Sequence, residues 1–134
     1  MAVLSNKPHL ITFDVYSALL DVELGLTKNL AEFAGDDIDL ANTAARLWRA
    51  KQLEWASVSN SLNKKKISFE DCTIHSLNYV ADKFRLRLSD NIKKDLVASW
   101  DALPLYPEAD EAVVALKNMG FKIAILSNGD KKML

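Results

Sequence analysis

The chain has 134 residues, of which 49% are hydrophobic and 26% are charged, and this balance excludes a disordered or collagen-like protein. Its 17 lysines and arginines are matched by 18 aspartates and glutamates, so the basic excess expected of a nucleic-acid-binding protein is missing. The longest stretch without a charged residue, 72–81, has ten residues, whereas a membrane-spanning helix needs about twenty. We therefore expect no nucleic-acid partner and no membrane partner.

The N-terminus and the cysteine usage predict the cellular location. Lys7 and Pro8 precede any long apolar run, which is not the pattern of a signal peptide. Cys72 is the one cysteine of the chain and has no partner for an internal disulfide, which suits a reducing compartment. These features predict a soluble cytoplasmic protein that acts on a small molecule.

The first predicted element is a buried strand over His9–Phe13, an apolar, β-branched run that stops at Asp14. Most of the following chain is predicted to be helical. Between Asp37 and Leu62, apolar residues recur with a period of 3.6, which predicts an amphipathic helix. The buried face of this helix is expected to carry Leu40, Ala44, Leu47, Trp48, Trp55, Val58 and Leu62.

Two further helices are predicted at serine residues that suit the N-cap position. Ser68 precedes Glu70 and Asp71, and acidic residues are favoured in the first turn of a helix. Another helix opens near Ser89. The apolar side chains expected to be buried along these two helices are Ile74, Leu77, Val80, Ala81, Phe84, Ile92, Leu96 and Trp100.

The end of the chain predicts half of a parallel α/β unit. A helix is expected to start at Pro107 and to end at Gly120, which suits a left-handed cap. A second apolar strand, 121–126, follows and pairs most simply with the first strand. This order predicts an α/β fold in which residues 1–19 and 99–134 form a partial core domain and residues 20–98 form an inserted helical domain. Two strands make a poor parallel sheet, so we expect a part of a larger domain.

Three groups of residues are candidates for chemistry. Asp14 ends a buried strand, where an ionised carboxylate can attack an electrophilic carbon or phosphorus, although a capping role is favoured on this residue alone. Ser127 and Asn128 follow the second strand and suit an oxyanion or a substrate carboxylate, or an ordinary turn. Arg49 stands between Trp48 and Trp55 and is suited to clamp an anion, or belongs to a solvated helix face.

Cys72 and His75 have a helical spacing that could present two metal ligands. No second pair of such residues accompanies them, and the other histidine, His9, lies on the first predicted strand. We therefore predict an ordinary helix cysteine and a partly exposed histidine rather than a metal site.

Three sequence runs together resemble the haloacid dehalogenase superfamily, and within it the type II, L-2-haloacid dehalogenases. The runs are Phe13-Asp14-Val15-Tyr16, then Leu47-Trp48-Arg49-Ala50-Lys51-Gln52-Leu53-Glu54-Trp55, and then Ile125-Leu126-Ser127-Asn128-Gly129. The resemblance implies a Rossmannoid parallel-sheet core, here incomplete, with a helical cap inserted after the first strand. It also makes a homodimer an expectation, because caps of this family contribute to dimer contacts.

The resemblance implies a role for each candidate residue. Asp14 is expected to displace halide from a 2-haloacid by in-line attack, giving an ester that water hydrolyses to a 2-hydroxy acid of inverted configuration. Arg49 would receive the halide, Ser127 and Asn128 would hold the substrate carboxylate, and Tyr16 would line the pocket. Phosphatases of the superfamily carry a second aspartate where this chain has Tyr16, so we expect hydrolysis without magnesium or any other cofactor.

The chain departs from the family pattern in three ways. Ser17-Ala18 stands where the family usually has Gly-Thr, and Ala50 stands where it usually has an amide. The later lysine and the acidic motif of the family would lie beyond the second strand, where this chain ends. We therefore expect negligible dehalogenase turnover from the 134-residue chain alone. The alternatives are a hydrolase of the superfamily with another small acid substrate and a non-catalytic interaction protein that retains the cap and half of the core.

Overall fold

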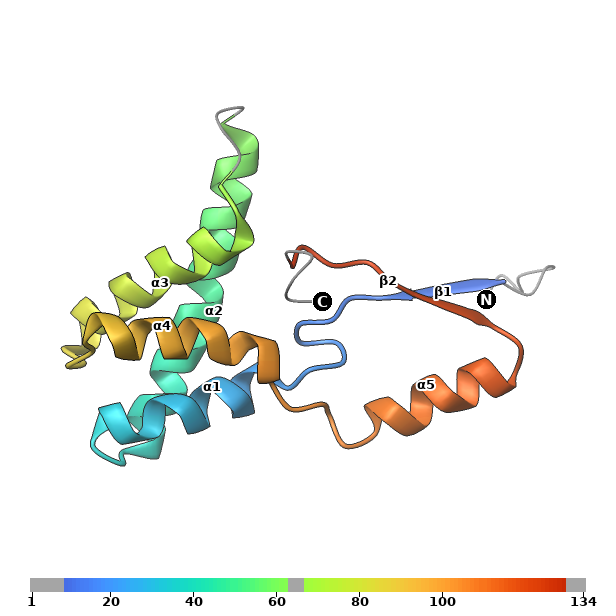
Figure 1. Ribbon diagram of the computed structural model, residues 1–134, viewed down its shortest axis with the longest axis horizontal. Helices are drawn as coiled ribbons and strands as arrows, with labels where there is room; N and C mark the ends of the chain where they lie inside the picture. Colours follow the sequence, from blue (N-terminus) through green and yellow to red (C-terminus); the bar gives the residue numbers. More distant parts are fainter. Residues whose placement is uncertain (1–8, 63–66, 130–134) are drawn as a thin grey trace, which may run out of the picture. The chain divides into compact units, whose positions relative to one another are not determined.

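The computed structural model describes residues 9–62 and 67–129, so the N-terminal residues used for the leader prediction lie outside the described part. The described residues divide into two compact units. One unit contains the residues up to Asp21 together with Leu105–Ser127, and the other contains Val22–Pro104 with Asn128 and Gly129. We refer to them as the sheet unit and the helical unit and describe each by itself (Figure 1).

The sheet unit contains the two strands expected from the sequence. Strand β1 (Leu10–Phe13) and strand β2 (Lys122–Ile125) pair in parallel, with Phe13 opposite Ile125. Helix α5 (Ala109–Asn118) precedes β2, and Gly120 turns the chain between them with a φ of 86°, a conformation that glycine adopts readily. The predicted α/β class with a parallel sheet is confirmed by this arrangement.

Helix α5 begins two residues later than Pro107, the predicted start. The backbone N–H of Ala109 donates to the carbonyl of Tyr106 at 3.0 Å, so residues 106–109 form a turn before the helix. Proline fixes its own φ at a value that suits either a turn or a first helical turn, and the local sequence does not separate the two.

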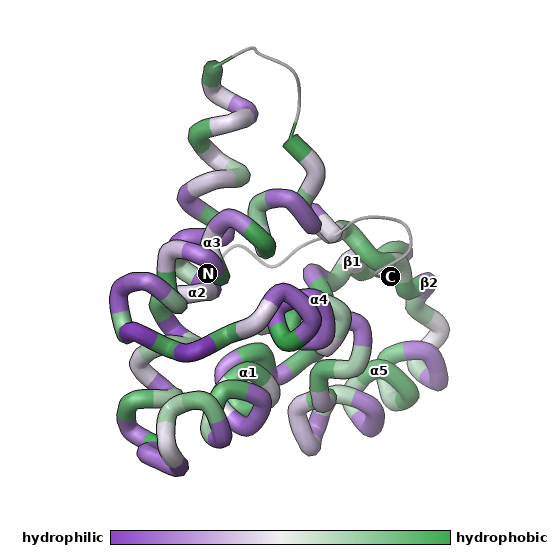
Figure 2. The backbone as a smooth tube through the Cα atoms, turned by 60° about the vertical axis from the view of Figure 1, so that its left-hand side comes forward, coloured by the Kyte–Doolittle hydropathy of each residue, from purple (hydrophilic) through white to green (hydrophobic). Residues whose placement is uncertain are grey.

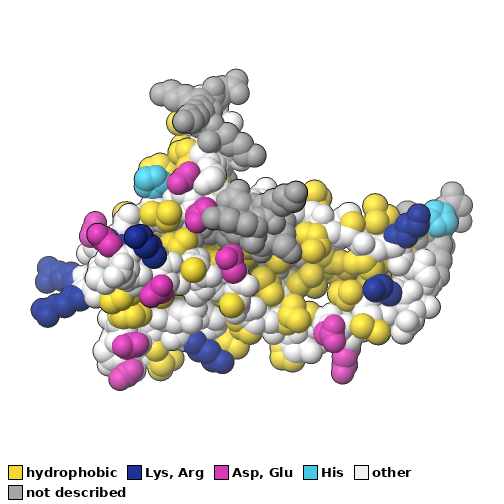
Figure 3. Space-filling view, viewed as in Figure 1, with side chains coloured by type: hydrophobic (Ala, Val, Ile, Leu, Met, Phe, Trp, Pro, Cys, Tyr) yellow, Lys and Arg dark blue, Asp and Glu magenta, His cyan; other side chains and the backbone are white. Residues whose placement is uncertain are grey.

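Apolar side chains at the ends of the strands are exposed. Leu10 and Ile125 are 54% and 55% exposed, and Leu126 is 71% exposed, although parallel sheets are usually buried on both faces. Figure 3 shows hydrophobic side chains gathered over the strands and α5 on the face in view. Within the described residues, one helix and two strands do not bury the apolar surface that this sheet presents.

The helical unit is built from four α-helices and two 3-10 turns. Their bounds are α1 (Val22–Ala31), η1 (Glu32–Ala34), α2 (Ile38–Ser61), α3 (Phe69–Phe84), α4 (Asp90–Ala98) and η2 (Ser99–Ala102). Helix α2 packs against both α1 and α3. The side chains of Asp37, Ser68 and Ser89 accept hydrogen bonds from backbone N–H groups three residues later, which fixes the starts of α2, α3 and α4.

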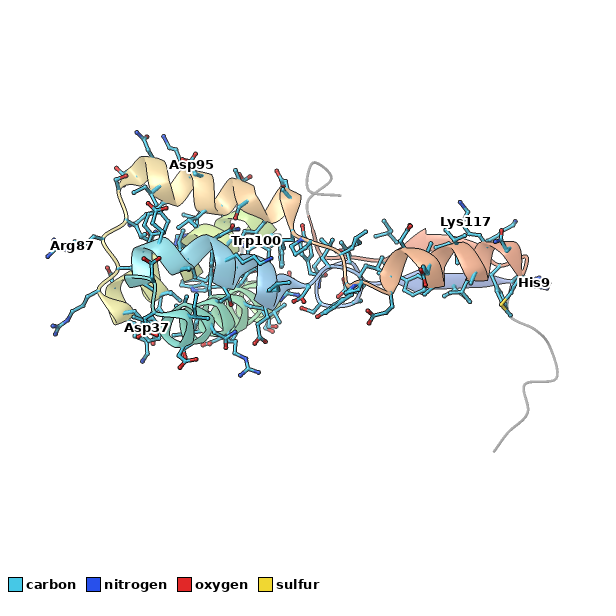
Figure 4. The ribbon with its side chains drawn as sticks, turned by 90° about the horizontal axis from the view of Figure 1, so that it is seen from below. His9, Asp37, Arg87, Asp95, Trp100 and Lys117 are labelled. Atoms are coloured by element: carbon cyan, nitrogen blue, oxygen red, sulfur yellow. The ribbon has the colours of Figure 1, made fainter. Side chains whose placement is uncertain are left out.

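Small residues bring α2 close to its neighbours. Ala41, Ala44 and Ala45 are buried, and Trp48 follows them with no exposed surface. The Trp48 ring meets the Trp100 ring edge-on, with centroids 5.5 Å apart, a geometry that aromatic pairs favour. Figure 4 shows Trp100 within the helical unit, whereas Arg87 projects outward from the loop before α4.

The second half of α2 differs from the prediction. Trp55, Val58 and Leu62 are 40%, 47% and 57% exposed, although all three were expected on the buried face. The upper part of the α2–α3 pair extends beyond α1 and α4 (Figure 1), so within this unit only α3 remains as a neighbour there. Figure 2 shows that hydrophobic positions continue along this part of α2. The apolar periodicity of the helix therefore extends beyond the part of the helix that is buried.

Candidate active site

Asp14 directly follows β1 and its side chain is exposed. The backbone N–H of Val15 donates to Oδ1 of Asp14 at 2.8 Å. An aspartate acts as a nucleophile through a carboxylate oxygen. The strand end therefore presents a carboxylate that has one oxygen held by the backbone.

The loop after Asp14 is a tight turn that backbone hydrogen bonds close. The carbonyl of Val15 accepts from the N–H groups of Leu19 and Leu20 at 3.0 and 2.9 Å. Ser17 donates its N–H to the carbonyl of Leu20 at 3.1 Å and has a φ of 67°, in the left-handed region that favours glycine. Tyr16 is buried, with 2% of its surface exposed. Ser17 thus occupies a conformation that suits the glycine that the family resemblance implies at this position.

Ser127 lies near the same edge of the sheet as Asp14. The pairing of Phe13 with Ile125 is extended by a hydrogen bond of 2.8 Å from the N–H of Leu126 to the carbonyl of Phe13. Because the strands are parallel, the residues that follow them emerge at one edge, the edge where open α/β sheets bind their ligands. Within the sheet unit, the structure brings together the ends of the strands that carry Asp14 and Ser127, and Asn128 is next along the chain.

Arg49 lies in the middle of α2, in the helical unit, and is partly exposed. Its Nη1 donates to Oε1 of Gln52 at 2.7 Å, and its Cζ lies 5.9 Å from the centre of the Trp100 ring. A guanidinium at this distance from an aromatic ring is attracted by the electrons of the ring. The neighbouring tryptophan and the amide both restrain the Arg49 side chain.

The other two cations of this stretch of α2 pair with carboxylates. Nε of Arg46 lies 3.2 Å from Glu23 of α1, and Nζ of Lys51 lies 2.7 Å from Glu54. The hydrogen bond with Glu54 raises the pKa of Lys51 above its usual value. Arg46 and Lys51 therefore match the alternative of a solvated, ion-paired face.

No role was predicted for Gln52, although it lies three residues after Arg49 in the sequence. It has no exposed surface and its Nε2 lies 2.5 Å from Oγ1 of Thr73 on α3. The sequence places Gln52 one helical turn after Arg49, which indicates that the two side chains can interact. It does not indicate that Gln52 also binds Thr73, because Thr73 belongs to another helix.

The described residues form no cluster of metal ligands, and two cavities of the helical unit are not lined by the predicted site residues. No group of three or more histidine, cysteine, aspartate or glutamate side chains in 9–62 and 67–129 is placed to hold a metal ion. Cys72 is buried, while His75 is exposed and stacks on Trp55 with ring centres 5.1 Å apart. Cavities of about 660 and 340 Å³ in the helical unit are lined by none of the five predicted site residues. Within the described part of the chain, no helix has the length and apolarity to span a membrane.

Two features of the fold bear on the class of protein. The parallel strands end in polar residues, and a helical unit lies between the two strands in the sequence. A family model for haloacid dehalogenase-like hydrolases matches residues 8–134, and the chain belongs to this family. The family predicted from the three sequence runs is thereby confirmed.

The curated proteins that this chain resembles are dehalogenases. The chain is 34% identical over 122 residues to (S)-2-haloacid dehalogenase 1 of Pseudomonas sp. (strain CBS-3), covering 91% of this chain and 52% of that protein. It is 31% identical to haloacetate dehalogenase H-2 of Moraxella sp. (strain B), covering 96% and 55% of the two chains. The chain thus spans about half the length of the curated relatives it matches.

Solved structures show the same likeness in three dimensions. A dehalogenase crystal structure with an intermediate complex has a TM-score of 0.81 and 29% identity, covering 97% of this chain and 55% of that chain. The L-2-haloacid dehalogenase from Xanthobacter autotrophicus has a TM-score of 0.80 and 25% identity, covering 95% and 49%. The fold of this chain therefore matches about half of the length of each of these two dehalogenase chains.

Proposed function

We propose that this chain supplies the nucleophile and the halide-binding helix of a 2-haloacid dehalogenase. The observation that carries the proposal is the position of Asp14 directly after β1. The last residues of β1 and β2, Phe13 and Ile125, are paired, and the chain continues from β2 to Ser127. The edge where both strands end is the usual ligand-binding edge of a parallel sheet. The similar (S)-2-haloacid dehalogenases favour a 2-haloacid as the substrate class.

In the proposed reaction, a carboxylate oxygen of Asp14 attacks the α-carbon of the haloacid. The new C–O bond forms as the carbon–halogen bond breaks, and the halide leaves with the bonding electrons. Water then hydrolyses the ester, which regenerates the Asp14 carboxylate and releases a 2-hydroxy acid of inverted configuration. The solved dehalogenase with an intermediate complex is consistent with a reaction of two steps.

Cationic and hydrogen-bonding groups are required because both reactants are anions. Two like charges about 4 Å apart repel by roughly 4 kcal/mol at an effective dielectric constant of 20. In the proposal, the hydroxyl of Ser127 and the amide of Asn128 hold the substrate carboxylate, and Tyr16 lines the pocket. Arg49 receives the departing halide, whose negative charge develops in the transition state.

The proposal extends to the organisation of the protein. The sheet unit acts as the catalytic core, expected over 1–19 and 99–134, and the helical unit acts as the cap, expected over 20–98. We further propose a cytoplasmic location, which the single buried Cys72 favours, and a homodimer, which the exposed apolar part of α2 favours. Sedimentation of the purified protein over a range of concentrations tests the oligomeric state.

The function is tested with a hybrid enzyme in which this chain replaces the matching part of (S)-2-haloacid dehalogenase 1. We expect the hybrid to release chloride from 2-chloropropionate and the Asp14→Asn hybrid to release none, while both give the same circular dichroism spectrum. The unfused 134-residue chain is expected to show negligible turnover. A folded hybrid without chloride release, or an active Asp14→Asn hybrid, contradicts the proposal.

The substrate range is tested with the same hybrid. Ser17-Ala18 lacks the threonine hydroxyl usual beside the nucleophile, and this difference favours a second candidate, a hydrolase of another small acid. A panel of 2-halogenated acids of increasing chain length, together with small acids that carry another leaving group in place of the halogen, distinguishes the two. Turnover of the haloacids alone supports the first candidate, while faster turnover of the other small acids supports the second.

A further inference from the structure

Arg49 is held by a side chain that the protein buries completely. Its Nη1 donates to Oε1 of Gln52 at 2.7 Å, and Gln52 lies one helical turn further along α2. Gln52 has no exposed surface, although glutamine is mostly found at protein surfaces. A buried amide that lacks a hydrogen-bond partner at its oxygen or its nitrogen destabilises the fold. The surroundings of Gln52 therefore decide which atom faces Arg49.

Thr73 determines the orientation of the Gln52 amide. The Thr73 hydroxyl donates its one proton to the carbonyl of Phe69 at 2.9 Å, so toward Gln52 it can only accept. Nε2 of Gln52 donates to this hydroxyl oxygen at a distance of 2.5 Å. The amide oxygen is then left to face Arg49, where it accepts from the guanidinium.

Thr73 is itself fixed against α2. Nε1 of Trp48 donates to the backbone carbonyl of Thr73 at 3.0 Å, and both residues are fully buried. Trp48 also packs edge-on against Trp100, over whose ring the Arg49 guanidinium lies. The chain of contacts from α3 to Arg49 thus runs through groups that have little freedom to move.

We propose that Gln52 is the positioning residue of the halide site, a neutral anchor that orients the Arg49 guanidinium without adding negative charge beside it. This inference rests on the proposed function, in which Arg49 receives the departing halide. A carboxylate at position 52 could make the same contact, but it would form an ion pair and lower the attraction of the site for an anion. An amide orients the cation through one charge-assisted hydrogen bond and contributes no charge of its own.

The test compares Gln52→Leu and Gln52→Glu with the control Ser76→Ala. Leucine removes the acceptor, and glutamate keeps the acceptor but adds a charge. Ser76 is also fully buried on α3, and its hydroxyl donates to backbone carbonyls of its own helix, so its loss leaves the hydrogen bonds of the Gln52 amide in place while it perturbs the core. Each variant is made in the 134-residue chain and in the hybrid enzyme.

Two measurements separate positioning from stability. In the 134-residue chain, NMR of the Arg49 guanidinium is expected to show loss of order in Gln52→Leu and not in Ser76→Ala. In the hybrid enzyme, the inhibition constant of bromide is expected to rise about tenfold in Gln52→Leu, the effect of losing one hydrogen bond to a charged group. The kcat is expected to fall more than KM changes, because the halide charge develops in the transition state.

Gln52→Glu gives the sharpest readout. We expect weak bromide inhibition, because the introduced carboxylate forms an ion pair with Arg49 and lowers the attraction of the site for an anion. Bromide inhibition within about twofold of the unaltered hybrid in both Gln52 variants, or an Arg49 signal unchanged in Gln52→Leu, overturns the inference. If the unaltered hybrid releases no halide, the proposed function fails, while the NMR comparison still decides whether Gln52 orders Arg49.

Discussion

Gly25 of α1 lies directly against Leu103. A Cβ atom added at Gly25 would come within 2.5 Å of Cδ2 of Leu103 and within 2.8 Å of Cδ of Pro104, closer than real Cβ contacts. Both neighbours belong to the segment that closes the helical unit, so the absence of a side chain at position 25 lets this segment pack on α1.

The first prediction concerns this contact. Alanine is favoured over glycine within a helix by about 1 kcal/mol, but overpacking of a buried contact costs about 1–3 kcal/mol. We expect Gly25→Ala to lower the free energy of unfolding by about 1 kcal/mol. Urea unfolding followed by circular dichroism measures the change, and Lys28→Ala on the exposed side of α1 is the control. A more stable Gly25→Ala variant would show that Leu103 moves aside without cost.

The second prediction concerns the turn after Asp14. Ser17 holds a φ of 67°, which costs a residue with a Cβ roughly 1–2 kcal/mol, whereas glycine adopts this conformation freely. Glycine also has greater entropy in the unfolded chain, so the expected net gain of Ser17→Gly is up to about 1 kcal/mol. A higher urea midpoint checks this, and Ala18→Gly, next to it, is expected to give no gain. Equal stabilisation by both glycines would rule out relief of strain at position 17.

The third prediction uses two tryptophans of α2 in opposite settings. Trp48 is fully buried and donates to the carbonyl of Thr73, whereas Trp55 is 40% exposed. We expect Trp48→Phe to lower the free energy of unfolding by about 2 kcal/mol, through the lost hydrogen bond and the space left behind. Trp55→Phe should cost less than about 0.5 kcal/mol, as exposed substitutions usually do. Similar losses in both variants would contradict the described burial of Trp48.

The fourth prediction concerns metal dependence. Tyr16 stands two residues after Asp14, where phosphatases of the superfamily carry an aspartate near their magnesium site. A phenol is not the hard carboxylate ligand that magnesium prefers. We expect chloride release by the hybrid enzyme to be unchanged after treatment with EDTA and after addition of magnesium. Activity that EDTA abolishes and magnesium restores would overturn the prediction.

Much of the local structure was predictable because its causes are local. Asp37, Ser68 and Ser89 cap helices through contacts three residues away, so the sequence around each helix start contains both partners. The two strands were predictable because short β-branched apolar runs between polar turns fit few other structures. The order of the elements along the chain then predicted that the two strands pair.

The remaining features depend on partners far along the chain. The apolar period of α2 predicted burial through Leu62, but burial ends where the other helices end, and periodicity does not encode the length of a neighbour. The role of Gln52 likewise depends on Thr73, which α3 brings to it. The left-handed backbone at Ser17 was not predicted either, because serine gives no signal for it.

The parallel pairing of Phe13 with Ile125 joins segments that lie more than a hundred residues apart, while the helices form one uninterrupted stretch from Val22 to Pro104. Closing so long a loop has a large entropic cost before any contact compensates for it, whereas neighbouring helices need only short loops. We therefore expect the pairing of the two strands, and with it the edge that carries Asp14, to form more slowly than the contacts within the helical unit.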